Sequence, residues 1–293
     1  MTLSTELPAA LDAERHTMDT ADAGRLSYYA DTSRTGRPLV LIHSINAAPS
    51  AFEMKPLFDH YRSIRPVYAL DLPGFGASDR SDRAYSPELY AKVLSDFLTA
   101  VVRDRADVIA FSLSSEFAAR SVPIAAPCFA SLALISPTGF GHRSPPTGNA
   151  SERLHRLFRL PGFGGGLYKL LTSRLSIRYF LGLAFEGPLP PDMVDYAYAT
   201  SHQPGAKHAP FHFLSFKLFT PDALSRLYAP LELPVLVLYD RDPNITFDRL
   251  PEFLAQHPNW HARRIEPTLG LPHWEQTKRT TEALDEFWAT ATG

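Results

Sequence analysis

The chain has 293 residues, of which 45% are hydrophobic and 20% charged, and its formal net charge is −2. This composition is that of a globular protein, and the small net charge argues against nucleic-acid binding as the main activity. The single cysteine, Cys128, excludes an internal disulfide and fits a reducing compartment. The N-terminal residues lack a signal-peptide pattern, and no apolar run approaches the ~18 residues of a membrane helix. We therefore expect a cytoplasmic protein.

Apolar runs alternate with helical patterns along the first half of the chain. Residues 1–20 read as a loose leader, and residues 25–30 alternate enough to form an edge strand. Later runs are apolar throughout, which is typical of strands buried on both faces of a sheet. These runs are PLVLIHS (38–44), RPVYALD (65–71), ADVIAF (106–111) and FASLALISP (129–137). The alternation predicts an α/β fold with a mostly parallel central sheet flanked by helices.

The alternation stops between residues 141 and 221, where helical periodicity and many aromatic residues replace it. The strand pattern returns from Leu231 with LPVLVLYD, followed by a helix near 247–256, a short strand around 261–266 and a closing helix. We predict a core domain formed by residues 1–140 and 222–293, with residues 141–221 inserted as a helical cap.

Ser112 is the first candidate catalytic residue. It ends the run DVIAF and directly precedes a helical pattern, so it would lie on a sharp turn between a strand and a helix. Its neighbours two positions away, Ala110 and Ser114, are small, as the crowding there requires. The backbone N–H of Leu113 would point toward a developing oxyanion. The alternative is that Ser112 merely caps the helix, which serine does routinely.

A nucleophilic serine needs a base and an orienting acid. Asp240 and Asp242 follow a late strand, where ligands bind in open parallel sheets, and His273 precedes the last helix. The chain order of serine, aspartate and histidine is the order that one fold with this alternation uses.

Five stretches resemble the motifs of the α/β-hydrolase fold superfamily, of the type with a helical cap. They are LVLIHSINAAPSAF, ALDLPGFGASD, AFSLSS, DRDPNI and PHWEQ, and the resemblance spans roughly residues 25–290. It implies a serine hydrolase in which His273 takes the proton of Ser112 and Asp242 orients the imidazole. The backbone N–H groups of Ile45 and Leu113 would then form the oxyanion hole.

The sequence departs from the family pattern at several positions. Ser44, Ala110 and Ser114 stand where the family usually has glycine. The loop that carries the acid, DRDPNI, is one residue shorter than the common form of the family, which leaves Asp240 as an alternative to Asp242. We call this stretch the acid loop. None of these changes removes a chemical group from the mechanism.

The apolar, aromatic cap could roof a pocket for a hydrophobic acyl or alcohol group, and Phe111, Phe211 and Trp274 are predicted to contact the substrate. A serine nucleophile leaves several substrate classes open: esters, thioesters, lactones and the carbon–carbon bonds of diketone-like molecules. Among these classes, the resemblance leads us to expect cleavage of an ester-like bond in a hydrophobic small molecule. The alternatives are a non-catalytic ligand-binding member of the fold, a carbon–carbon bond hydrolase and a cofactor-free haloperoxidase-like enzyme.

No cofactor and no metal are expected. His202, His208 and His212 lie within eleven residues, but they lack partner ligands and suitable spacing. The expected partner is a hydrophobic small-molecule substrate, with no nucleic acid, and the chain is expected to be a monomer or homodimer. Basic residues between Arg153 and Arg178 could bring the aromatic cap onto an anionic membrane, but a solvated face is the favoured interpretation.

Overall fold

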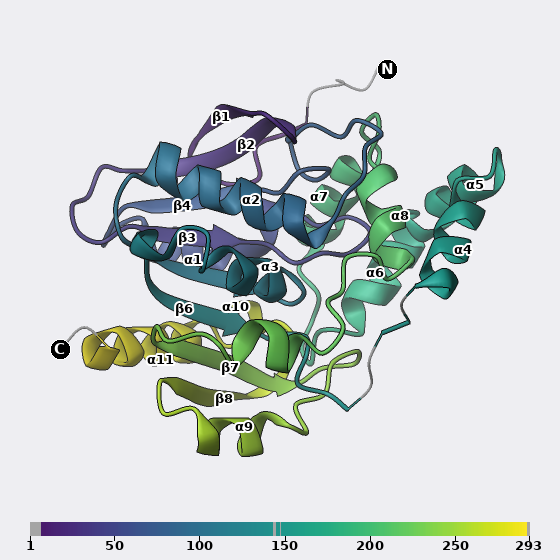
Figure 1. Cartoon of the computed structure of the whole chain (residues 1–293). Coiled ribbons are helices and arrows are strands. Elements are labelled where there is room, and N and C mark those ends of the chain that lie inside the picture. The colour runs from purple at the N-terminus through teal and green to yellow at the C-terminus, as the bar shows by residue number, and fades with distance from the viewer. Residues whose placement is uncertain (1–6, 143–144, 147, 292–293) are drawn as a thin grey trace.

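The protein is described by a computed structural model that covers residues 7–142, 145–146 and 148–291. Its centre is an eight-stranded sheet in the order β1-β2-β4-β3-β5-β6-β7-β8 (Figure 1). β2 pairs antiparallel with β1 and with β4, and all other neighbours are parallel. The strands are β1 (Glu14–Thr20), β2 (Gly24–Asp31), β3 (Leu39–Ile42), β4 (Val67–Asp71), β5 (Ala106–Phe111), β6 (Phe129–Ile135), β7 (Val235–Arg241) and β8 (Trp260–Leu269). The predicted, mostly parallel α/β sheet is confirmed.

Helices cover both faces of the sheet. On one face, α1 (Lys55–Tyr61) and α11 (Thr277–Ala291) pack side chains such as Tyr61 and Leu284 into one apolar core. On the other, α2 (Pro87–Phe97) and α3 (Ser114–Ser121) contribute Tyr90 and Phe117 to a second core. The remaining helical elements of the core are α9 (Leu250–Gln256), α10 (Pro272–Glu275), and the short turns Ala51–Met54, Leu98–Val102, Ala126–Cys128 and Leu224–Tyr228.

The central strands form where the sequence is continuously apolar. Every residue of β3, β5 and β6 is buried, because helices cover both faces of this part of the sheet. The parallel strands all present their carboxyl ends to one edge of the sheet. Loops from that edge carry Ser112 after β5 and Asp242 after β7, which is where open parallel sheets bind ligands.

The expectation of a loose leader over residues 1–20 is wrong for its second half, because Glu14–Thr20 forms the edge strand β1. Consequently β2 is an inner strand and not the edge. The side chains of His16 and Met18 are half-buried while their neighbours in the strand are exposed, and His16 stacks on Tyr28 of β2 at 5.3 Å. The period-2 pattern is present in the sequence, but largely polar residues carry it. The short strand expected around 261–266 is also longer, since β8 covers Trp260–Leu269.

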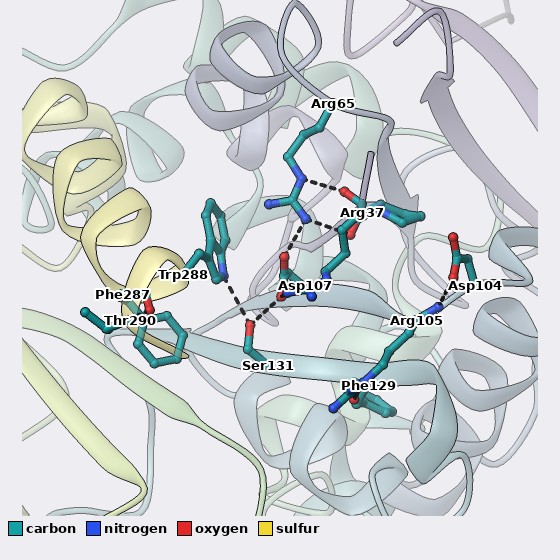
Figure 2. Close-up of polar contacts among 11 residues, drawn as sticks. Arg37, Arg65, Asp104, Arg105, Asp107, Phe129, Ser131, Phe287, Trp288 and Thr290 are labelled. Atoms are coloured by element: carbon teal, nitrogen blue, oxygen red, sulfur yellow. Dashed lines mark hydrogen bonds and ion pairs between the residues drawn. The ribbon is translucent and has the colours of Figure 1, made fainter. Parts of the chain in front are cut away.

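A buried carboxylate stabilises the opposite, amino-terminal edge of the sheet (Figure 2). Asp107 of β5 is 1% exposed, forms an ion pair with Arg65 and accepts a hydrogen bond from Ser131 at 2.7 Å. Trp288 of α11 donates its indole N–H to the same Ser131 hydroxyl at 3.1 Å, and the guanidinium of Arg65 lies over the Trp288 ring. This network joins β5, β6 and the last helix at the edge remote from Ser112.

Helices occupy the segment between β6 and β7. They are α4 (Asn149–Phe158), α5 (Phe163–Leu171), α6 (Arg174–Gly182), α7 (Pro191–Ser201) and α8 (His208–Leu214). Figure 1 shows them beside the sheet, at the edge that carries the loops after β5 and β7. No helix in the described part of the chain is both long and apolar enough to cross a membrane.

Candidate active site

Ser112 lies in a left-handed turn between β5 and α3. Its φ is +57°, a conformation that costs an L-residue roughly 1–2 kcal/mol. The backbone holds it there, because the Ser112 N–H donates to the carbonyl of Ile135 at 2.8 Å. Ser112 is partly exposed, whereas the residues on either side of it, from Ala106 to Ala119, are all buried. The turn therefore presents one side chain of this segment outward, and that side chain is the serine hydroxyl.

Two serines at the start of α3 use their hydroxyl groups in hydrogen bonds, and one of them, Ser114, stands where the family usually has glycine. Ser114 Oγ donates to the carbonyl of His43 at 2.6 Å, which ties the start of α3 to the loop after β3. Ser115 Oγ donates to the carbonyl of Ala110 at 3.3 Å. Both serines are fully buried, so these bonds satisfy groups that water cannot reach.

The loop after β3 is held by two buried side chains. His43 donates from Nδ1 to the carbonyl of Ser44 at 2.6 Å and accepts the Leu72 N–H on Nε2 at 2.9 Å. Burial lowers the pKa of His43 to about 4, so its ring is neutral and positions the loop. Glu53 accepts the Ser44 N–H at 2.8 Å and the Asn46 side-chain amide at 2.8 Å. Burial raises the pKa of the Glu53 carboxyl.

Asp71 connects this loop to the glycine-rich loop after β4. Its carboxylate accepts the Ala51 N–H at 2.8 Å and the Ala77 N–H at 2.9 Å. Gly76, at φ +52°, lies directly against that carboxylate, and a β-carbon there would overlap it. The D-x-x-G-x-G-x-S motif therefore acts as a clamp between two loops, and its aspartate is fully buried.

The two backbone N–H groups that were predicted to bind an oxyanion, those of Ile45 and Leu113, have no acceptor of their own in the described chain. The Ser114–His43 hydrogen bond brings the two segments that carry them together. Leu113 also precedes the first residue of α3, where the helix dipole favours negative charge.

Asp242 lies just beyond β7, and its carboxylate Oδ1 accepts the N–H groups of Asn244 at 2.7 Å and Ile245 at 2.9 Å. Burial raises the pKa of this carboxyl. Its Oδ2 lies against Gly270 at φ +101°, where a β-carbon would approach within 2.8 Å. The acid loop and the histidine loop are thus in direct contact three residues before His273.

Asp240, the alternative acid, has a structural environment. It is 5% exposed, and its two oxygens accept from Arg264 Nε at 2.7 Å and from the Thr268 N–H at 2.8 Å. Both partners belong to β8, so Asp240 joins β7 to β8.

His273 lies in α10 and is completely buried. Its Nε2 is 2.9 Å from the carbonyl oxygen of Glu53, and because a carbonyl only accepts, Nε2 carries the proton. Its Nδ1 is buried and has no hydrogen-bond partner among the described residues. Burial lowers the pKa of His273 to about 4. The structure thus places His273 and Asp242 on touching loops, but within the described chain His273 bonds to neither Asp242 nor Ser112.

The three predicted substrate-contacting residues have different surroundings. Phe111 precedes Ser112, and its ring lies 5.0 Å from that of His273. Trp274 is half-buried and donates its indole N–H to the Glu53 carbonyl at 2.6 Å. Phe211 packs against Phe158 in a separate apolar cluster of the helices between β6 and β7. Contact of any of them with a substrate stays a prediction.

Arg80 is a partly buried cation that was not among the residues predicted from the sequence. Its guanidinium binds the Gly76 carbonyl and donates to the Thr200 hydroxyl of α7 at 3.0 Å, so it links the core to the cap. It lines a small cavity together with Ala47 of the loop after β3 and Tyr168 of α5. Burial lowers the pKa of Arg80. A signal existed in the sequence, because Arg80 directly follows the glycine-rich loop.

No cluster of three or more histidine, cysteine or acidic residues suited to a metal ion occurs in the described ranges. His208 lies 3.5 Å from Asp82, and His212 contacts His155 with ring centroids 4.2 Å apart.

Solved structures share this fold over more than nine-tenths of the chain. An esterase from Thermogutta terrifontis matches with a TM-score of 0.72 and 18% identity, covering 95% of this chain and 99% of the other. A serine hydrolase involved in carbazole degradation matches with a TM-score of 0.74 and 15% identity, covering 94% and 99%. N-formylmaleamic acid deformylase from Pseudomonas putida matches with a TM-score of 0.70 and 17% identity, covering 93% and 100%.

Comparison with curated proteins gives no match. The model of one protein family, the alpha/beta hydrolase family, matches residues 39–283, which include the loops after β3, β4, β5, β7 and β8. On this match and on its fold, the chain belongs to the alpha/beta hydrolase family.

Proposed function

We propose that the protein is a serine hydrolase that cleaves an ester-like bond in a hydrophobic small molecule, with Ser112 as the nucleophile. The observation that carries this proposal is the conformation of Ser112. Ser112 is held at φ +57° in a turn and is partly exposed, whereas its neighbours are buried. Strain of this kind persists where the surrounding structure enforces it, and functional sites are where it concentrates.

In the proposed reaction the Ser112 hydroxyl attacks a carbonyl carbon, and the resulting oxyanion accepts hydrogen bonds from the N–H groups of Ile45 and Leu113. Each such donor is worth ~2.7–4 kcal/mol of transition-state stabilisation in hydrolases where one has been removed. Both N–H groups lack an acceptor among the described residues, which supports this role. Water then attacks the acyl-enzyme by the same route and releases the acid.

His273 is the proposed base and Asp242 the proposed acid. For this triad to form, the His273 ring has to leave the Glu53 carbonyl and its proton has to move from Nε2 to Nδ1, so that Nε2 can accept the Ser112 proton and Nδ1 can donate to Asp242. A buried nitrogen without a partner costs about 1–3 kcal/mol, and Nδ1 of His273 is such a nitrogen. Triad assembly would give it a partner, which favours the rearrangement. Burial lowers the pKa of His273 to about 4, so near pH 7 the ring is neutral and keeps one nitrogen lone pair, the form that a general base needs.

The test is labelling with a fluorophosphonate probe, read by intact mass. We expect one adduct on the wild type, none on Ser112→Ala, and labelling slowed ~10²–10⁴-fold in His273→Ala, the usual contribution of a general base. Ser225→Ala, at an exposed serine outside the site, is the matched control and should label like the wild type. A folded wild type that forms no adduct would overturn the proposal.

Substitutions of Asp242 and Asp240 test which of the two aspartates orients the proposed base. Asp242→Asn should lower the labelling rate by up to ~10⁴-fold, since the imidazole would lose its orienting anion. Asp240→Asn should weaken the contact between β7 and β8 and leave the labelling rate of the folded protein unchanged. Equal labelling rates of Asp242→Asn and the wild type would remove Asp242 from the mechanism.

A non-catalytic ligand-binding role is the second candidate, and the position of His273 favours it. The ring is fully buried and hydrogen-bonded to Glu53, which would suffice if the residue served packing alone. A wild type that stays unlabelled, yet gains thermal stability from hydrophobic esters, would support this candidate.

A further inference from the structure

We propose that the outer face of α4, α5 and α6 docks on the surface of an anionic membrane. This face, here called the cap face, comprises the exposed side chains from Arg153 to Leu183. The proposal is independent of the chemistry at Ser112, because no residue of that site belongs to the cap face.

Exposed apolar side chains are concentrated on the cap face. Eight of the ten large apolar side chains that are exposed in the described chain lie between Leu157 and Leu183, and the other two are Ile64 and Ile124. The most exposed are Leu175 at 82%, Leu170 at 67% and Tyr179 at 63%. Single exposed apolar residues are ordinary, but a concentration of this kind marks an interaction surface.

Helical spacing brings these side chains together on the outer sides of the helices. Exposed residues recur every four positions along α6, at Leu175 and Tyr179 and then at Leu183, which caps the helix, while Ile177 on the other side is buried. On α4, Arg153 and Leu157 are exposed at the same spacing, and His155 is buried. Figure 1 shows α4 and α5 at the outer edge of the cap, away from the sheet.

Cations that form no ion pair lie among these apolar side chains, although Arg156 is close enough to Glu152 to interact with its carboxylate electrostatically. Arg153, Arg156, Lys169 and Arg178 are exposed, and none forms an ion pair with a described residue. The acidic residues within the same helices and their flanks are already paired, Glu152 with Lys217 and Glu186 with Arg241. The cap face is therefore apolar and carries uncompensated positive charge, which is the pattern of helices that lie in a membrane interface.

The charge selects a membrane over a second copy of the chain. A symmetric dimer brings the same patch of both copies together, so the unpaired cations of one copy would face those of the other. An anionic leaflet pairs with them instead, at about 1 kcal/mol for each cation near the surface, and accepts the apolar side chains between its headgroups.

The experiment is vesicle co-sedimentation of the full chain with phosphatidylcholine alone and with phosphatidylcholine mixed with phosphatidylserine. We expect binding to the mixed vesicles that weakens as salt rises, and much weaker binding to the neutral ones. Lys169→Gln with Arg178→Gln should weaken binding by at least about tenfold. The matched control is Arg25→Gln with Arg34→Gln, at two exposed arginines outside the cap face, and it should bind like the wild type.

The apolar contribution is tested by Leu170→Glu with Leu175→Glu, against Ile64→Glu with Ile124→Glu as the control. The first pair should abolish vesicle binding and the second should leave it unchanged. Both pairs lie outside the active site, so fluorophosphonate labelling in solution should be the same as in the wild type. Absence of binding to anionic vesicles, or equal binding by all variants, would overturn the proposal. So would a dimer in light scattering that Leu170→Glu with Leu175→Glu dissociates, because the cap face would then serve a second copy.

Discussion

Replacing Ser112 by glycine tests whether the turn after β5 stores strain. At φ +57° an L-residue costs roughly 1–2 kcal/mol, whereas glycine adopts this conformation freely. Glycine also increases the conformational entropy of the unfolded chain, which reduces the gain in stability by about 0.4–1 kcal/mol. Ser112→Gly should therefore be more stable than Ser112→Ala by about 0.5–1 kcal/mol, the difference between these two effects. The comparison with alanine removes the hydroxyl from both variants, so that only the backbone effect remains.

The assay is urea unfolding, in which the midpoint shifts while the slope stays constant. Ser114, two residues further on, is the internal control because it begins α3 and has no positive φ. There, Ser114→Gly should be less stable than Ser114→Ala by about 0.5–1 kcal/mol, the usual cost of glycine in a helix. The sign of the glycine effect should reverse between the two positions. If Ser112→Gly is the less stable variant, the turn is not strained, and the main support for Ser112 as a nucleophile is lost.

Two further predictions concern buried ionisable groups. Asp107→Ala should lower the free energy of unfolding by about 3–5 kcal/mol, since it leaves the nearly buried Arg65 without its carboxylate partner. The variant that remains folded should still react with fluorophosphonate, because Asp107 lies at the sheet edge remote from Ser112. A loss of labelling in folded protein would contradict this separation of the two edges. Burial lowers the pKa of His273 to about 4, so below pH 6.5 the unfolded chain binds a proton there that the native state does not, and stability falls on acidification. The stability gap between wild type and His273→Gln should shrink by about 2 kcal/mol from pH 6.5 to pH 5 in urea titrations, and a constant gap would show that the ring titrates normally.

The central strands were predictable because a strand buried on both faces of a sheet is apolar at every position. β3, β5 and β6 are buried at every position, and each coincides with a continuous apolar run. β1 was missed because it has one exposed side and lies at the sheet edge, so polar residues dominate it. Its pairing with β2 depends on alternation and backbone hydrogen bonds, and composition does not reveal either.

The loops that carry the candidate residues were predictable from the sequence, and the orientation of the side chains was not. The order and placement of Ser112, Asp242 and His273 follow from the strands that precede them, because parallel strands end at one edge. The orientation of the His273 ring depends on the carbonyl of Glu53, which is 220 positions away in sequence. Glu53 itself gave no signal, since a glutamate in a short helical turn usually faces water, yet here it is buried and organises the loop after β3.

The turn at Ser112 shows why the family usually has glycine two residues before and two residues after the nucleophile, in the pattern G-x-S-x-G. The left-handed conformation falls on Ser112 itself, and neither Ala110 nor Ser114 has a positive φ. Glycine at those two positions therefore serves volume and not backbone freedom, so a small side chain can replace it if the space allows. Ser114 uses that space, because its hydroxyl donates to the His43 carbonyl at 2.6 Å and fixes the loop that carries the Ile45 N–H. The departure from glycine thus adds a bond between the nucleophile turn and the oxyanion loop, and it leaves the conformation of the proposed nucleophile unchanged.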